Sequence, residues 1–416
     1  MRWACRKRDN NQNRNPFALS LSKGLERCFD KLSTNGTRDE DKMDNLGTIG
    51  TTEEQIELMD VATNFCRDKS PIDKVRGLID DELGYDPGTW KEIGELGWLA
   101  IAIPEAHDGV GLSMAEVVPI AEQMGRNLMS TPFGSTTLAA QALLAGGSEA
   151  QQAAWLPKIA AGAAATLALR EDNGDWDLAN IECSATESGG TVTLSGKKQL
   201  VLWADSAELI IASVKIDGAV RFALIERSQL GDGALRRETV IDETARSYEV
   251  TLDGVTLPAD ALFDASRTRE TLEKIELSAG LIHAAEMTGG AQAVIDYTLE
   301  YLKTRKQFGK IIGSYQALKH PTVNNYVEYE KARTHLYSAA HSWGEQGRGE
   351  VAVRMAAAQS HSSYSTSADR AIQFHGGFGF THDCDAQLHR RKAILAGALI
   401  GDAAYQRSKL AGLLFD

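Results

Sequence analysis

The chain has 416 residues, of which 43% are hydrophobic, and a formal net charge of −13 at pH 7. This length and apolar content can bury a large core in two or three domains, and the acidic balance argues against nucleic acid or an anionic membrane as a partner. No apolar run approaches the roughly 20 residues of a membrane-spanning helix. The cysteines have neither metal-ligand spacing nor a disulfide framework, so we expect no metal site and a reducing, cytoplasmic location.

Residues 1–45 differ from the rest of the chain. Residues 1–42 hold ten Lys or Arg against six Asp or Glu, are rich in asparagine, and lack the apolar centre of a signal peptide. A transit peptide is one alternative, against which the acids and asparagines count. We expect a disordered extension, or a start placed upstream of a natural beginning at Met43.

The remaining chain predicts an α+β protein of three domains. Residues 46–165 carry apolar residues at helical spacing, for example at 53–65 and 114–124, and predict an N-terminal helical domain. Residues 166–262 contain short β-rich runs at 191–195, 209–214, 220–225 and 247–252, separated by glycine and aspartate turns, and predict a middle β-barrel. Long helical patterns then return, and residues 263–416 predict a C-terminal four-helix bundle.

One stretch of this last region, residues 301–316, suggests a binding site. A long helical pattern breaks at Gly309 and resumes at Gln316, so that Arg305, Gln307 and Phe308 stand side by side at the break. An arginine for a phosphate, amides for heterocycle edges and a phenyl ring for a ring face suit a long, flat, anionic ligand. The alternative is that Arg305 and Gln307 are solvated helix-end residues and that Phe308 belongs to the core.

A second stretch, residues 371–381, closes a helix with three glycines. Gly376 and Gly377, which follow Gln373 closely, allow a backbone to approach a ligand or to turn with positive φ. The order is not the GxGxxG of a strand-turn-helix nucleotide fold, and no strand pattern precedes it. The alternative is a simple glycine stop at the end of a helix.

Together and in this order, the two stretches resemble the acyl-CoA dehydrogenase family, whose signature is an R-x-x-F-G turn, a later glutamine and a Q-x-x-G-G-x-G motif. Residues 97–111 and 155–162 match further family elements, and the resemblance covers roughly residues 50 to 410. It implies a flavoprotein oxidoreductase that takes FAD and an acyl-CoA substrate. A carboxylate removes the α-proton of the thioester while a hydride leaves the β-carbon for the flavin. The residues implied to reach the ADP half of FAD across a subunit interface are Arg305, Gln307, Phe308, Gln316, Gln373, Gly376 and Gly377.

The family carries its catalytic glutamate at one of two places, and neither has an acid here. The first lies 26 residues before Arg305, where this chain has Ala279. The second, near the end of the last arginine-rich helix, falls at Leu399 or Ile400.

Two nearby acids are candidate replacements for the missing base. Glu276 lies one helical turn before the first place, and Asp402 lies just beyond the second. The alternatives are a polar contact between packed helices for Glu276 and a solvated helix residue for Asp402. We interpret His283, His375 and His389 as structural histidines or as supports for a neighbouring group.

The middle domain also departs from the family pattern. Residues 170–177 replace the T-E-P-x-A-G-S-D loop that bonds the flavin and the acyl chain, and Leu202 stands where a threonine usually lies against the flavin ring. Trp203 is either a cover for a ring face or a barrel residue. The changed loop suggests a substrate unlike a straight-chain acyl group, such as a bulky ring-bearing thioester.

The residues that would serve the chain's own pocket have changed, whereas those that would reach a neighbour's FAD remain. Residues 373–404 resemble bacterial members that pair with a catalytic homologue in α2β2 complexes for steroid or bile-acid side-chain degradation. We therefore predict an acyl-CoA dehydrogenase chain that completes the FAD site of a hetero-oligomer, with a homologous subunit or a second copy of itself as partner. The alternatives are a self-sufficient dehydrogenase with a displaced base and a non-redox scaffold that binds a thioester or a protein.

Overall fold

The computed structural model describes residues 51–415, so the predictions for residues 1–45 and for Met43 lie outside the described residues. The described chain opens with α2 (Glu53–Lys69), α3 (Ile72–Ile79), α4 (Pro87–Glu95), α5 (Met114–Arg126), α6 (Phe133–Gly146) and α7 (Glu149–Ala160). Three of these helices begin with a capping box; in α5 the Ser113 hydroxyl and the Glu116 carboxylate bond each other's backbone N–H groups. The prediction that this part of the chain begins with helices is therefore confirmed. Capping boxes fix the residues at which three of these helices begin.

Two small sheets form the middle of the chain and enclose one apolar core. The larger sheet has the strand order β1-β5-β2-β3-β9, with β6 paired to β5, and the smaller has the order β4-β8-β7. Strand β5 runs parallel to β1 and β2, and the other pairs are antiparallel. The strands are β1 (Ala165–Ala168), β2 (Ser184–Ser188), β3 (Thr191–Ser195), β4 (Lys197–Leu202), β5 (Leu209–Ile216), β6 (Ala219–Glu226), β7 (Leu235–Glu238), β8 (Ser247–Thr251) and β9 (Thr256–Pro258).

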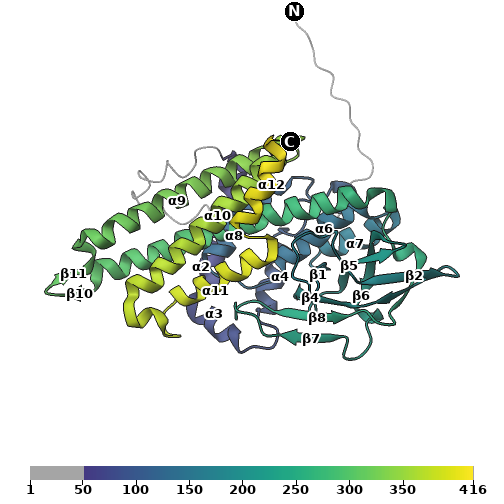
Figure 1. Ribbon diagram of the computed structural model, residues 1–416, viewed down its shortest axis with the longest axis horizontal. Helices are drawn as coiled ribbons and strands as arrows, with labels where there is room; N and C mark the ends of the chain where they lie inside the picture. The colour runs from purple at the N-terminus through teal and green to yellow at the C-terminus, as the bar shows by residue number, and fades with distance from the viewer. Residues whose placement is uncertain (1–50, 416) are drawn as a thin grey trace, which may run out of the picture.

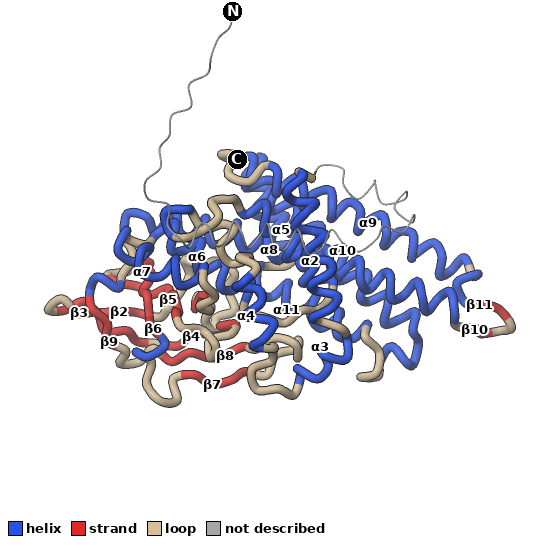
Figure 2. The backbone as a smooth tube through the Cα atoms, turned by 180° about the vertical axis from the view of Figure 1, so that it is seen from behind, coloured by secondary structure: helices blue, strands red, loops and turns tan. Residues whose placement is uncertain are grey.

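Long helices make up the rest of the molecule. They are α8 (Thr268–Thr304), α9 (Gln316–His341), α10 (Arg348–His375), α11 (Ala386–Ile400) and α12 (Ala403–Phe415), with a hairpin of β10 (Lys306–Gln307) and β11 (Lys310–Ile311) between α8 and α9. Figure 1 shows α8, α9 and α10 as long helices side by side, with the hairpin at the end remote from the sheets. The view from behind in Figure 2 gives the same separation of hairpin and sheets.

Helix α8 joins the N-terminal helices to the bundle through a close contact with α5. A Cβ atom on Gly289 would lie 1.8 Å from the carbonyl oxygen of Glu122, and one on Gly125 would lie 2.0 Å from that of Glu286. Only glycine allows the two backbones to approach so closely. The order of helices, sheets and bundle agrees with the predicted fold class. No helix within residues 51–415 combines the length and the apolar character needed to cross a membrane.

Candidate active site

A cavity of about 120 Å³ lies where α8, strands β1 and β4, the 170–178 loop and the junction between α11 and α12 meet. Its wall includes Ala279 from α8 and both Leu399 and Ile400 from the end of α11. The two places where the sequence comparison expected a catalytic acid, 120 residues apart in the chain, therefore border one cavity. Neither place supplies a carboxylate.

The candidate base Glu276 also lines this cavity, but it is held by an arginine. Its carboxylate accepts a hydrogen bond of 3.0 Å from Arg354, which also donates to Glu350 at 2.8 Å. Burial lowers the pKa of Arg354, yet its bonds to Glu350 and Glu276 outweigh burial and raise that pKa overall. The structure therefore places Glu276 on the cavity wall in an ion pair with Arg354.

The second candidate base, Asp402, has a local structural role. Its carboxylate accepts a 2.8 Å hydrogen bond from the backbone N–H of Tyr405 in the first turn of α12. Such a bond satisfies one of the free N–H groups at a helix start. Asp402 is not among the residues that line the cavity, whereas Glu276 is.

The loop that replaces the family's flavin-binding segment closes one side of the cavity. Arg170 donates hydrogen bonds to the carbonyl of Asp175 and to that of Leu399 at the end of α11. The indole N–H of Trp176 donates to the carbonyl of Ala398 at 2.9 Å, and its ring packs 5.2 Å from that of Tyr405. Burial lowers the pKa of Arg170. The loop thus satisfies carbonyls that the last turn of a helix leaves without partners.

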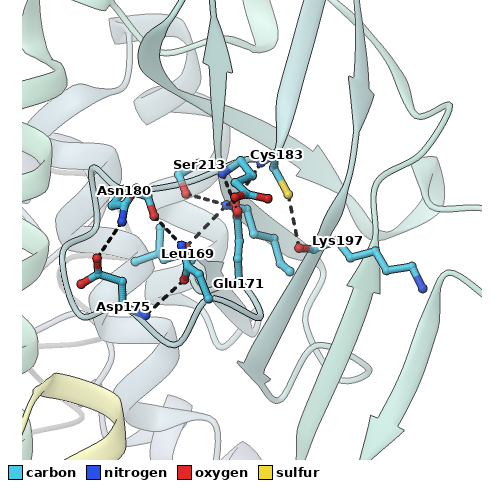
Figure 3. Close-up of polar contacts among 10 residues, drawn as sticks. Leu169, Glu171, Asp175, Asn180, Cys183, Lys197 and Ser213 are labelled. Carbon is cyan, nitrogen blue, oxygen red and sulfur yellow. Dashed lines mark hydrogen bonds and ion pairs between the residues drawn. The ribbon is translucent and has the colours of Figure 1, made fainter.

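A buried ion pair between Lys198 and Glu171 anchors the base of this loop. Figure 3 shows Glu171 close to Cys183 and Ser213. Lys198, whose side chain is fully buried, lies 2.6 Å from Glu171 and donates to Ser213 at 3.0 Å. Glu171 also accepts hydrogen bonds from the backbone N–H groups of Glu182 and Cys183. Burial opposes ionisation of Glu171, but Lys198 and the two N–H groups hold the pKa of this carboxyl below its ordinary value.

A second, smaller cavity of about 70 Å³ adjoins the first and contains Leu202 and Trp203, the residues that the resemblance places at the flavin ring. A cavity of roughly 150 Å³ accommodates a single benzene ring. The 70 Å³ space by itself is smaller than the cavity that one such ring needs. Trp203 is buried and turns its ring edge toward Tyr85 at 5.7 Å, which agrees with its interpretation as a barrel residue.

His283 lines both cavities, and the sequence analysis did not assign it to the site. Its Nδ1 atom lies 3.1 Å from a carboxylate oxygen of Glu286, three residues further along α8. Burial raises the pKa of Glu286, but His283 and Lys392 more than compensate and lower it overall. The signal that could have found this pair is the His-x-x-Glu spacing, which puts both side chains on one helix face.

The break after α8 is a tight hairpin that exposes the predicted ligand-binding residues. Phe308 and Gly309 both have positive φ, 51° and 75°, which is the pattern of a two-residue type I′ turn. Phe308 is 90% exposed, so its interpretation as a core residue is wrong. Arg305, Gln307 and Gln316 are also exposed.

The glycine-rich end of α10 lies beside the start of this hairpin. His375 stacks on Tyr301 at 4.2 Å and on Tyr297 at 4.9 Å, both of which belong to α8. Burial lowers the pKa of His375, whose Nδ1 atom lies 2.8 Å from the carbonyl of Ala371. These contacts fix the end of α10 against the helix that leads into Arg305.

All seven residues that the resemblance assigns to FAD binding are exposed, and none lines either cavity. They lie at the hairpin end of the bundle, away from the sheets (Figure 1). The predicted set is therefore brought together at one end of the molecule and separated from the chain's own cavities.

The chain resembles known proteins along most of its length. Residues 52–163 match the family model described as acyl-CoA dehydrogenase, N-terminal domain, and residues 279–414 match the one described as acyl-CoA dehydrogenase, C-terminal domain. Acyl-CoA dehydrogenase IpdE2 of Mycobacterium tuberculosis is 30% identical over 77% of this chain and 84% of its own length. The IpdE2 protein of Mycolicibacterium smegmatis is 27% identical over 88% of this chain and its entire own length.

Solved structures agree with this relationship. The steroid ACAD Tcur3481-Tcur3483, in a variant form, superposes with a TM-score of 0.76 and 25% identity over 87% of this chain and 98% of its own. The ChsE4-ChsE5 complex of Mycobacterium tuberculosis has a TM-score of 0.78 and 22% identity over 88% of this chain and 98% of its own, and this likeness concerns the fold.

Proposed function

Because the chain belongs to the acyl-CoA dehydrogenase family, we propose that it serves the FAD-dependent α,β-dehydrogenation of an acyl-CoA thioester as the subunit that completes a homologous partner's FAD site. The observation that carries the proposal is the contrast between the hairpin end of the bundle and the space beside the sheets. The seven residues suited to FAD are exposed at the hairpin end, whereas the space at Leu202 and Trp203 measures only about 70 Å³. The FAD held by the partner supplies the acceptor for the hydride.

The exposed residues have the chemistry that the ADP half of FAD requires. Arg305 offers a planar cation to a phosphate, Gln307 and Gln316 offer amide donors and acceptors, and Phe308 offers a ring face. A phenyl ring that is 90% exposed gains little in an isolated chain but buries a large apolar area against a partner or a heterocycle. The turn that displays it puts a non-glycine residue at positive φ, a strained conformation typical of functional sites.

We propose a steroid-type or other ring-bearing acyl-CoA as the substrate of the complex and the cytoplasm as its location. The proposal is supported by the similarity to a structure described as a steroid ACAD and, for the pairing of unlike chains, by the likeness to the ChsE4-ChsE5 complex. The partner would hold the catalytic carboxylate that is absent here at Ala279 and Leu399.

The test is the visible absorption of the chain purified alone and then co-purified with a homologous acyl-CoA dehydrogenase subunit. We expect little flavin in the chain alone and about one FAD for each pair of unlike chains in the complex. Arg305→Gln should lower the flavin content of the complex about tenfold, because a charge-assisted bond to phosphate is lost. The matched control is Arg269→Gln, at a side chain that is 91% exposed at the opposite end of α8.

Two other outcomes would overturn the proposal. Flavin bound by the chain alone, bleached by an acyl-CoA and no longer bleached after Glu276→Gln, would establish a self-sufficient dehydrogenase with a displaced base. A complex without flavin would favour a scaffold without redox function.

A further inference from the structure

We propose that the 120 Å³ cavity of this chain performs one half of the family reaction by itself: reversible transfer of the α-proton of a short acyl thioester to His283, without oxidation. The proposal rests on the proposed function only for the thioester chemistry: its substrate is a short acyl group and not the ring-bearing one proposed for the complex, and it needs neither flavin nor a partner. The two can therefore fail independently.

His283 has the geometry of an oriented base. Its Nδ1 atom faces the Glu286 carboxylate at 3.1 Å, and with the proton of the neutral ring on Nδ1, the Nε2 lone pair is free to accept another. Within residues 51–415, the hydrogen bond found for the His283 ring involves Nδ1. His283 lies four positions after Ala279, so its backbone is about 6 Å along α8 from the family's first base position and its side chain lies on the same helix face. Both residues line the cavity.

Arg170 supplies the second group that the chemistry needs. The guanidinium uses two N–H groups on backbone carbonyls, and no carboxylate in residues 51–415 lies within ion-pair distance of it, although Glu276 and Asp175 are near enough to favour its charge. A guanidinium has five N–H donors, so further donors remain for a substrate oxygen. Since Arg170 and His283 both line the cavity, a thioester there would have a cation for its carbonyl oxygen and a base for its α-carbon.

The size of the cavity selects a short acyl group. At about 120 Å³ it is somewhat smaller than the roughly 150 Å³ cavity that holds benzene, so it accommodates about five carbon atoms. Leu138, Leu167, Leu178 and Ile275 give it apolar walls that suit an aliphatic chain. Trp176 and Tyr405, which are partly exposed, complete the wall where the loop meets α12.

The step balances without a redox partner. The C–H bond at the α-carbon breaks, its electron pair remains on the substrate as an enolate, and the proton forms an N–H bond at Nε2 of His283. Arg170 stabilises the negative oxygen of the enolate. In the reverse step the α-carbon takes back a proton, or a deuteron when the imidazole has exchanged with D2O.

The experiment is hydrogen exchange at the α-carbon of butyryl-CoA. The full chain, purified alone and free of flavin, is incubated with butyryl-CoA in D2O, and the thioester mass is followed. We expect incorporation of deuterium at the α-carbon well above the rate in buffer. His283→Gln should lower this rate by about 100-fold or more, which is the usual contribution of a general base. His341→Gln, an exposed histidine at the end of α9, is the matched control and should exchange as the unmodified chain does.

Two further variants separate proton transfer from folding. Ala279→Leu fills the cavity and leaves the His283–Glu286 pair intact, so it should abolish exchange. Glu286 is a positioning residue; Glu286→Gln should lower the rate at saturating thioester about tenfold while the half-saturating concentration stays the same. Exchange no faster than in buffer, or equal exchange with and without His283, would overturn the proposal, as would faster exchange with dodecanoyl-CoA than with butyryl-CoA.

Discussion

The buried pair of Lys198 and Glu171 gives the sharpest test of how the loop beside the cavity is held. Lys198→Met keeps the length and apolar volume of the side chain but removes its charge. Glu171, whose side chain is 5% exposed, would then be a buried carboxylate without its cation. Breaking a buried pair in this way costs about 3–5 kcal/mol.

We expect the lower end of that range, about 3 kcal/mol, for this substitution. Two backbone N–H groups, those of Glu182 and Cys183, would still bond the carboxylate of Glu171 and would limit the cost. In a large domain, each kcal/mol of lost stability lowers the melting temperature by roughly 2 °C, so a thermal melt should show a fall of about 6 °C. Because Glu171 follows Arg170 directly, the loop should also loosen beside the cavity.

The neighbouring lysine provides the matched control. Lys197 pairs with Glu249 at 3.2 Å, but the Lys197 side chain is 54% exposed, so Lys197→Met should cost less than about 1 kcal/mol. A double variant, Lys198→Met with Glu171→Gln, should recover part of the loss because no charge remains buried. Equal melting temperatures for the two single lysine variants would refute the argument from burial.

Three other predictions concern packing, loop anchoring and pH. Gly289→Ala should cost at least about 3 kcal/mol in a denaturant titration, because its Cβ would lie 1.8 Å from the carbonyl oxygen of Glu122; an unchanged midpoint would contradict the packing described. Trp176→Phe keeps the ring but loses the bond to the carbonyl of Ala398, and should lower stability by about 1 kcal/mol and raise binding of an apolar dye. Burial lowers the pKa of His389 from 6.5 to about 3, so its NMR signals should show a neutral ring down to about pH 4. Because the unfolded chain takes up this proton below about pH 6.5, His389 should reduce stability as pH falls from 6.5 toward 3; a ring that titrates near 6.5 would disprove its burial.

Local patterns predicted much of the fold because helices and strands have their own periods. The strands at 191–195 and 209–214 and the long helix before Arg305 were readable from spacing, glycine breaks and caps. The sequence patterns did not predict the short strands β1 and β4 or the parallel pairing of β1 with β5. Parallel pairing in particular depends on contacts between residues that are distant in the chain.

The candidate site was less accessible to sequence reasoning for the same physical reason. The contact of Arg170 with Leu399 joins residues 229 positions apart, and no local pattern encodes it. The pairing of Glu276 with Arg354 also needs the packed bundle. The exposure of Phe308 follows from a two-residue turn, whereas the sequence indicated only a break in the helical pattern at Gly309.

Helix α8 is a single rod of 37 residues, about 55 Å long, and it carries Ala279 and His283 in one half and leads into Arg305 at its end. Ala279 and Arg305 are 26 residues apart, about 39 Å along the helix axis, so neither side chain contacts the surroundings of the other. After duplication of an ancestral gene, one copy can therefore lose the residues of one half while selection preserves the other half. A few substitutions can therefore leave one descendant protein with catalysis and the other with cofactor binding, without any change of fold.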